Sequence, residues 1–132
     1  WGAALTAAGG VFDDARAVAA PEIVEALAAG IDAVVRLGGA TAGDKTMVDA
    51  ALPFREVLVA EFASSGDLAG SVKQAAAAAQ EAAEATAGIT SRLGRSRILG
   101  EKSLGTPDPG AHSFSVLMDA LADFLASPSG TA

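Results

Sequence analysis

The chain has 132 residues, 51% of them hydrophobic and only 5% aromatic, and its formal net charge is -7. This length and apolar content suit a single globular domain and argue against a disordered chain, while the acidic balance disfavours a nucleic-acid or anionic-membrane partner. The absence of cysteine excludes disulfides and thiolate metal sites. The sequence has no uninterrupted apolar run of about 18 residues, so it predicts no membrane span.

The apolar residues are mostly small and Ala-rich, and no segment alternates as a half-buried strand does, which predicts an all-α protein. A first helix is expected from Trp1 to about Ala8, stopped by Gly9 and Gly10. A second begins at Pro21 and ends at Gly38 and Gly39. Its buried stripe is predicted to be Ile23, Leu27, Ile31 and Val34, with Val24 and Val35 alongside.

The third helix is expected to start near Asp44 or Thr46, with Asp49 completing a capping box from Thr46. Pro53 lies inside it and predicts a kink rather than a stop, because it removes one backbone donor. The predicted apolar side consists of Val48, Leu52, Leu58, Val59 and Phe62.

The fourth helix is expected in the Ala-rich segment from about Leu68 to Gly88. A flexible linker is the alternative, but the high helix propensity of alanine and the helical spacing of the charges favour a helix. Its predicted flat face consists of Val72, Ala75, Ala76, Ala79 and Ala83. The fifth opens at Asp108 and Pro109, an N-cap followed by a first-turn proline. Its predicted buried face is Phe114, Leu117, Met118, Leu121, Phe124 and Leu125. About five helices with mostly short connections predict an antiparallel up-and-down bundle.

Two connections hold more specific residues than packing requires. The first, "GGATAGDKTM" (Gly38 to Met47), is not a Walker loop, because Asp44 separates Gly43 from Lys45 and no strand precedes it. The second, Gly94 to Ser113, gathers cations and glycines before a helix start, which suits either an anion site or a plain solvated loop. In an antiparallel bundle both connections can occupy one end and form a single pocket.

The segments "GGATAGDKTMVDAALP" and "GRSRILGEKSLGTPDPGAHS" resemble the L subunit of dihydroxyacetone kinase, or the equivalent C-terminal domain of the fused ATP-dependent enzyme. The resemblance covers the chain from Trp1 to near Leu125 and implies that residues 1–132 are one nucleotide-binding domain, the C-terminal portion of a longer one. It implies an antiparallel helical barrel, here incomplete, that binds ADP or ATP at one end with Mg²⁺.

By position in the matched motifs, the resemblance implies six nucleotide-binding residues. Gly38 approaches the nucleotide through its backbone, Met47 packs against the adenine, and Arg95 contacts the nucleotide near its phosphates. Three residues at the start of the last helix form the edge of the site: Asp108, Pro109 and Gly110. Asp44, Lys45 and Thr46 are assigned mainly to capping and loop shape.

This sequence departs from the family pattern at Lys102, where Arg is usual, and at Thr106, where His is usual, which weakens any bidentate clamp there. The family's metal-binding aspartates precede the region matched here, so the Mg²⁺ ligands are expected in a missing N-terminal part and the fragment alone is expected to be inactive. Asp13 and Asp14 are interpreted as a solvated turn, and His112 as an ordinary surface residue.

The resemblance implies a cytoplasmic kinase component that transfers a phosphoryl group to dihydroxyacetone or a similar small ketone held by a partner subunit or domain. Two routes stay open: relay from a phosphotransferase-system subunit to a retained ADP, or exchange of free ATP. Two alternatives also stay open, a non-catalytic helical adaptor bundle and the nucleotide domain of another kinase, such as a fatty acid kinase.

Overall fold

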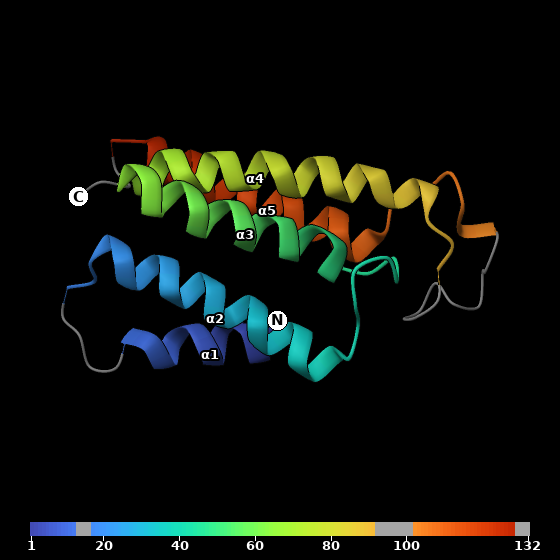
Figure 1. The fold of residues 1–132 in the computed structure, drawn as a ribbon, viewed down its shortest axis with the longest axis horizontal. Helices are drawn as coiled ribbons and strands as arrows, with labels where there is room; N and C mark the ends of the chain where they lie inside the picture. Colours follow the sequence, from blue (N-terminus) through green and yellow to red (C-terminus); the bar gives the residue numbers. More distant parts are fainter. Residues whose placement is uncertain (13–16, 92–101, 129–132) are drawn as a thin grey trace.

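The fold is given by a computed structural model, which describes residues 1–12, 17–91 and 102–128. Its main elements are α1 (Gly2–Phe12), α2 (Ala20–Gly38), α3 (Val48–Ser65), α4 (Leu68–Ala85), the 3-10 turn η1 (Thr86–Gly88) and α5 (Pro109–Ala126). Helices α1 and α2 form one antiparallel pair, and α3, α4 and α5 pack above it (Figure 1). The described ranges contain no strand, which confirms the prediction of an all-α bundle.

Helix α1 is longer than the sequence predicts. It continues through Gly9 and Gly10 to Phe12, so the expected stop at the two glycines is wrong. Glycine inside a helix costs only about 1 kcal/mol relative to alanine, which packing against a neighbour can offset. That neighbour is α2, where a Cβ built on Gly30 would lie 3.0 Å from the Ala4 carbonyl oxygen. Gly30 therefore permits the close approach of α1 to α2.

We expect Gly30→Val to push α1 away from α2 and to lower the free energy of unfolding by about 1–3 kcal/mol, the usual cost of overpacking. Gly9→Val is the matched control, because a Cβ on Gly9 would meet nothing within 4 Å. Urea denaturation followed by far-UV circular dichroism compares the two variants. A Gly30→Val protein as stable as the wild type would show that the α1–α2 contact is not tight.

The ends of α2 are those predicted, but its buried face is different. Pro21 lies in the first turn, and Gly39 ends the helix in a left-handed conformation at φ 62°. Of the four residues of the predicted stripe only Ile31 is buried, whereas Ile23, Leu27 and Val34 are partly buried. Because α2 packs against both α1 and α3, small residues on two sides are buried instead. The buried residues are Val24, Ala26, Gly30, Ile31 and Ala33.

Helix α3 begins at Val48, later than the predicted Asp44 or Thr46, because Met47 is its N-cap residue. The helix runs through Pro53 without ending, as expected, and the kink stays a prediction. Val59 is 43% exposed, so its assignment to the apolar side is wrong, whereas the fully buried Phe54 was missed.

Helix α4 matches its prediction closely. All five residues of the predicted flat face are buried, together with Ser71. Because alanine has a small side chain, this face lets both α3 and α5 pack closely against α4. The linker interpretation of the Ala-rich segment is therefore wrong.

Helix α5 begins at Pro109 with Asp108 as its N-cap, as predicted. Its buried face is rotated, however, and Leu117 and Phe124 are 48% and 57% exposed. Because successive residues of a helix are turned by ~100°, Leu117 and Phe124 lie to one side of Phe114 and the small buried residues lie to its other side. Those small buried residues are Ala111, Ser115 and Ala122.

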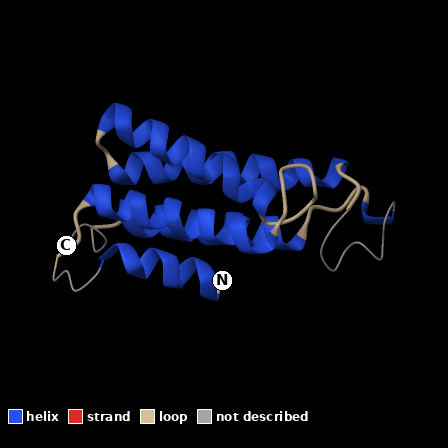
Figure 2. Cartoon of the chain, turned by 60° about the horizontal axis from the view of Figure 1, so that its bottom comes forward, coloured by secondary structure: helices blue, strands red, loops and turns tan. Residues whose placement is uncertain are grey.

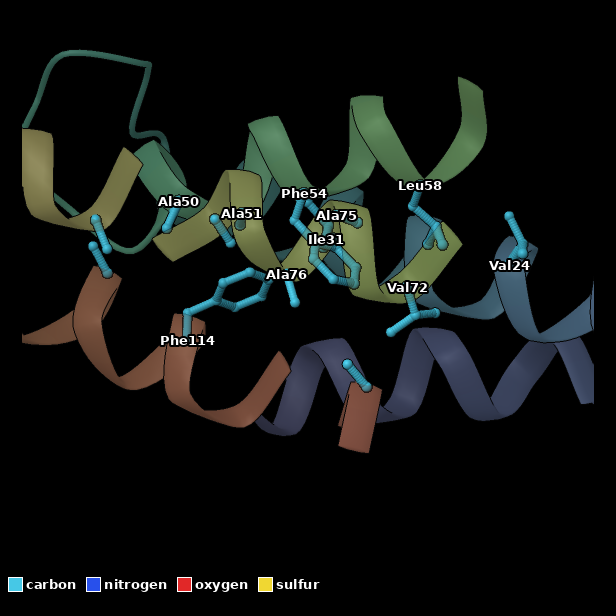
Figure 3. Packing of buried hydrophobic residues seen from close by; sticks show 14 residues of the cluster. Val24, Ile31, Ala50, Ala51, Phe54, Leu58, Val72, Ala75, Ala76 and Phe114 are labelled. Atoms are coloured by element: carbon cyan, nitrogen blue, oxygen red, sulfur yellow. The ribbon is translucent and has the colours of Figure 1, made fainter. Parts of the chain in front are cut away.

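The core lies mainly among α3, α4 and α5, joined by Val24 and Ile31 of α2, and it contains two aromatic rings. The Phe54 and Phe114 rings meet edge to face with centroids 5.6 Å apart, and the Trp1 ring stacks on Phe114 at 6.2 Å. Figure 3 shows Phe54 and Phe114 among aliphatic side chains such as Ile31 and Val72. None of the described helices has the length and apolar character needed to cross a membrane.

Candidate functional site

The two connections singled out in the sequence lie at the same end of the bundle. The α2–α3 connection and the described parts of the α4–α5 connection are close together in both views (Figures 1 and 2). A Cβ built on Gly110 would lie 3.4 Å from both the Cβ and the backbone nitrogen of Met47. The structure therefore brings together two predicted site residues that are far apart in the sequence.

Two aspartates fix the shape of the first connection. The Asp44 carboxylate accepts the Thr41 backbone N–H at 2.8 Å and the Thr41 hydroxyl at 3.0 Å. The Asp49 carboxylate accepts the N–H groups of Gly43 and Thr46, at 2.6 and 2.7 Å. The bond from the Thr46 N–H to the Asp49 carboxylate is one of the two bonds of the predicted capping box.

These bonds decide what the first connection can do chemically. A phosphate loop needs backbone N–H groups that point at the ligand. Here three of them donate to the carboxylates of Asp44 in the loop and Asp49 in the first turn of α3. The loop also joins two helices, without a preceding strand in the described residues. It is therefore a connector whose shape is fixed by these bonds, and the rejection of a Walker loop is confirmed.

Lys45 joins the first connection to the second. Its ammonium group donates a hydrogen bond to the Ser103 carbonyl oxygen, although the two residues are 58 positions apart. The second connection is fixed further by the Ser91 N–H, which donates to the Ser103 hydroxyl at 3.1 Å, and by the Gly105 N–H, which donates to the Ala87 carbonyl at 2.8 Å.

Asp108 is buried and its polar groups are bonded within the protein. The carboxylate accepts the Ala111 N–H at 2.8 Å, and the backbone carbonyl accepts the His112 N–H at 2.9 Å. The Asp108 N–H donates to the Thr86 hydroxyl at 2.7 Å, and this hydroxyl donates to the Ala83 carbonyl at 2.6 Å. Asp108 therefore shapes the start of α5, consistent with a place at the edge of a site.

Thr86 was missed by the sequence reasoning, because nothing marks a threonine at the end of an Ala-rich helix as the partner of a residue 22 positions away. We expect Thr86→Val to cost about 1–3 kcal/mol of folding stability, since it leaves a buried N–H without its acceptor. Thr86→Ser keeps the hydroxyl and is the control. Thermal unfolding compares them, and equal melting temperatures for Thr86→Val and wild type would contradict this role.

The other predicted site residues are placed as follows. Gly38 is the exposed last residue of α2, and a Cβ there would meet nothing within 4 Å, so its backbone contact with a nucleotide stays a prediction. Pro109 is exposed in the first turn of α5. Arg95 lies outside the described residues, as do Asp13 and Asp14.

Lys102, Thr106 and His112 are exposed. In the described ranges, no group of three or more His, Asp or Glu side chains is arranged to hold a metal ion. Magnesium is therefore not assigned to these residues.

The fold and the paired connections define a class of protein: an all-helical bundle domain in which two Gly-rich connectors meet beside the start of the last helix. The chain belongs to the DAK2 domain family, whose model matches residues 1–123. This agrees with the family resemblance of the two motifs.

Several curated relatives are kinases or kinase subunits. The chain is 59% identical over 125 residues to L-erythrulose 1-kinase of Mycolicibacterium smegmatis, a match covering 95% of this chain and 22% of that protein. It is 43% identical over 123 residues to D-erythrulose kinase of the same organism, covering 93% and 21%. It is 36% identical over 101 residues to the ADP-binding subunit DhaL of the PEP-dependent dihydroxyacetone kinase of Escherichia coli, covering 76% and 48%. The chain thus spans about a fifth of the erythrulose kinases and about half of the DhaL subunit.

Proposed function

We propose that residues 1–132 form a nucleotide-binding domain of a kinase that phosphorylates a hydroxyl group of a small ketose. The observation that carries the proposal is the contact between Met47 and Gly110, which joins the two motifs at one end of the bundle. The name of the DhaL relative adds support, since it describes an ADP-binding subunit.

In this proposal the site is built from both connections. The partly buried thioether of Met47 offers an apolar surface for the adenine ring, and Gly110 lets the start of α5 approach it. The Asp108 carboxylate accepts the Ala111 N–H in the helix cap and, being an anion, cannot neutralise phosphate charge. That neutralisation falls to cations, with Arg95 as the predicted contact and the exposed Lys102 nearby in sequence.

Bound ATP would supply the phosphoryl group, and the transfer depends mainly on positioning and charge neutralisation. Magnesium would add to that neutralisation. The described residues offer no cluster of ligands for it, so no step is assigned to a metal held by them.

We propose a tetrose or triose ketose as the acceptor, held by the rest of the polypeptide or by a partner subunit. Identity is 59% to L-erythrulose 1-kinase and 36% to the DhaL subunit, which favours erythrulose over dihydroxyacetone. The higher identity to L-erythrulose 1-kinase than to the DhaL subunit also favours exchange of free ATP over relay from a phosphotransferase-system subunit.

The test uses the full-length protein. Calorimetry with ADP and Mg²⁺ should show saturable binding, and a coupled assay should show ATP-dependent phosphorylation of L-erythrulose, D-erythrulose or dihydroxyacetone. A full-length protein that binds no adenine nucleotide would contradict the proposal and support an adaptor bundle. Nucleotide binding with a fatty acid as the only acceptor would assign it to a different kinase.

Arg95→Ala should weaken ADP binding by the full-length protein by about tenfold, the loss of one charge-assisted hydrogen bond, with unchanged helicity. Arg36→Ala, which removes a cation from the last turn of α2, is a charge-matched control. Calorimetry gives both affinities. Equal ADP affinity for Arg95→Ala and wild type would refute the role of Arg95.

A further inference from the structure

We propose that Lys45 is a positioning residue, which holds the two connections of the nucleotide site in their relative places without itself contacting the nucleotide. The inference rests on the proposed function. The geometry that points to it is the hydrogen bond from the Lys45 ammonium group to the Ser103 carbonyl oxygen, which crosses from one connection to the other.

The burial of Lys45 is unusual for its residue type. Lysine is almost never fully buried unless its charge has a partner, because removing an ammonium group from water is unfavourable. Lys45 is only 2% exposed. A connection that only joined α2 to α3 could leave this charge in water. The burial of Lys45 therefore indicates a structural role, which we assign to its bond with Ser103.

The backbone around Lys45 is held in one conformation. Lys45 has φ 60°, in the left-handed region that residues other than glycine seldom adopt. The Asp44 and Asp49 carboxylates bond to N–H groups on either side of it, at Thr41, Gly43 and Thr46. The direction of the Lys45 side chain is therefore set by the fold of its own loop.

The acceptor is equally well fixed. Ser103 is 6% exposed, and its hydroxyl accepts the Ser91 N–H at 3.1 Å. The bond therefore joins two buried residues whose surroundings are each fixed by further hydrogen bonds.

The positions of Lys45 and Ser103 explain why this bond matters for the site. Met47 follows two residues after Lys45, and Asp108 follows five residues after Ser103. The bond and the contact between Met47 and Gly110 therefore join the same two connections, at positions close to each other in the sequence. Without it, the two connections would keep their local hydrogen bonds but lose a polar link that sets the distance between them.

The test compares four variants of the full-length protein. Lys45→Met removes the donor and keeps much of the volume, and Lys45→Gln is a neutral polar variant that is one atom too short. Lys45→Arg keeps a cation that can donate to a carbonyl oxygen. Lys73→Met is the control, because Lys73 is exposed on α4 and its loss changes the net charge equally.

We expect the Kd for ADP, measured by calorimetry with Mg²⁺, to rise about tenfold or more in Lys45→Met and Lys45→Gln, the equivalent of one lost charged hydrogen bond. Lys45→Arg should recover affinity to within about threefold of wild type, and Lys73→Met should match wild type. The KM for ATP should rise with the Kd, while kcat at saturating ATP changes less, because the residue acts on binding geometry.

Wild-type protein that does not bind ADP would refute the proposed function itself. Wild-type protein that binds ADP while Lys45→Met stays within about twofold of it would overturn the inference alone. If Lys45→Met loses its helical far-UV spectrum, folded Lys45→Gln decides in the same way. An equal loss in Lys73→Met would also overturn it, because the effect would then be one of net charge.

Discussion

Replacing Gly110 with valine should weaken ADP binding by the full-length protein by about a hundredfold, the cost of a misplaced binding element. A Cβ at this position would lie 2.9 Å from the Asp108 carboxylate and 3.4 Å from the backbone nitrogen of Met47. The branched methyl groups of valine reach further still. They would displace the helix cap and push the two connections apart at the point where they meet.

Gly88→Val is the matched control for this substitution. Gly88 lies in η1 at the same end of the bundle, and a Cβ there would meet nothing within 4 Å. It should bind ADP as wild type does when both are measured by calorimetry. Gly110→Val that binds ADP within about threefold of wild type would show that the Met47–Gly110 contact is irrelevant to the site.

Replacing Phe54 with alanine should lower the free energy of unfolding by about 3–5 kcal/mol, the largest effect on stability that we expect from one substitution in the described residues. Phe54 is fully buried, and its ring meets the Phe114 ring at a centroid distance of 5.6 Å. The substitution would remove this ring contact and leave a cavity in the buried cluster.

Val59→Ala lies on the same helix and is the control, since Val59 is 43% exposed and should change stability by less than about 0.5 kcal/mol. Urea denaturation gives both values. A loss below about 1 kcal/mol in Phe54→Ala would mean that the core repacks around the missing ring and is not centred on it.

The sequence predicted helix type and most helix ends well, because caps and breakers act locally. Asp108 with Pro109 marked the start of α5, and Gly39 marked the end of α2. The flat face of α4 was also predicted in full, since its alanines and one valine are separated by Lys, Gln and Glu residues that mark the solvent side.

The buried faces of α2 and α5 were predicted less well, because each helix has apolar residues on more than one side. Choosing the larger residues placed Leu117 and Phe124 in the core, whereas the helix turns its small residues toward its neighbours. Which side is buried depends on where α3 and α4 lie, and local periodicity does not contain that information.

For the candidate site, the sequence motifs predicted that the two connections meet, but not the bonds that hold them together. The Lys45–Ser103 and Thr86–Asp108 bonds join residues 58 and 22 positions apart. Each has a backbone group as one partner, which every residue type offers. A sequence pattern therefore cannot single out these pairs before the fold is known.

Hydrogen exchange of the full-length protein, with and without saturating ADP and Mg²⁺, tests most directly whether the two connections form one nucleotide site. The account predicts that ADP slows exchange in two separate segments, residues 39–49 and 102–112, with little change at the opposite end of the bundle around residue 66. Slowing confined to only one of these segments, or located elsewhere in the chain, would contradict it.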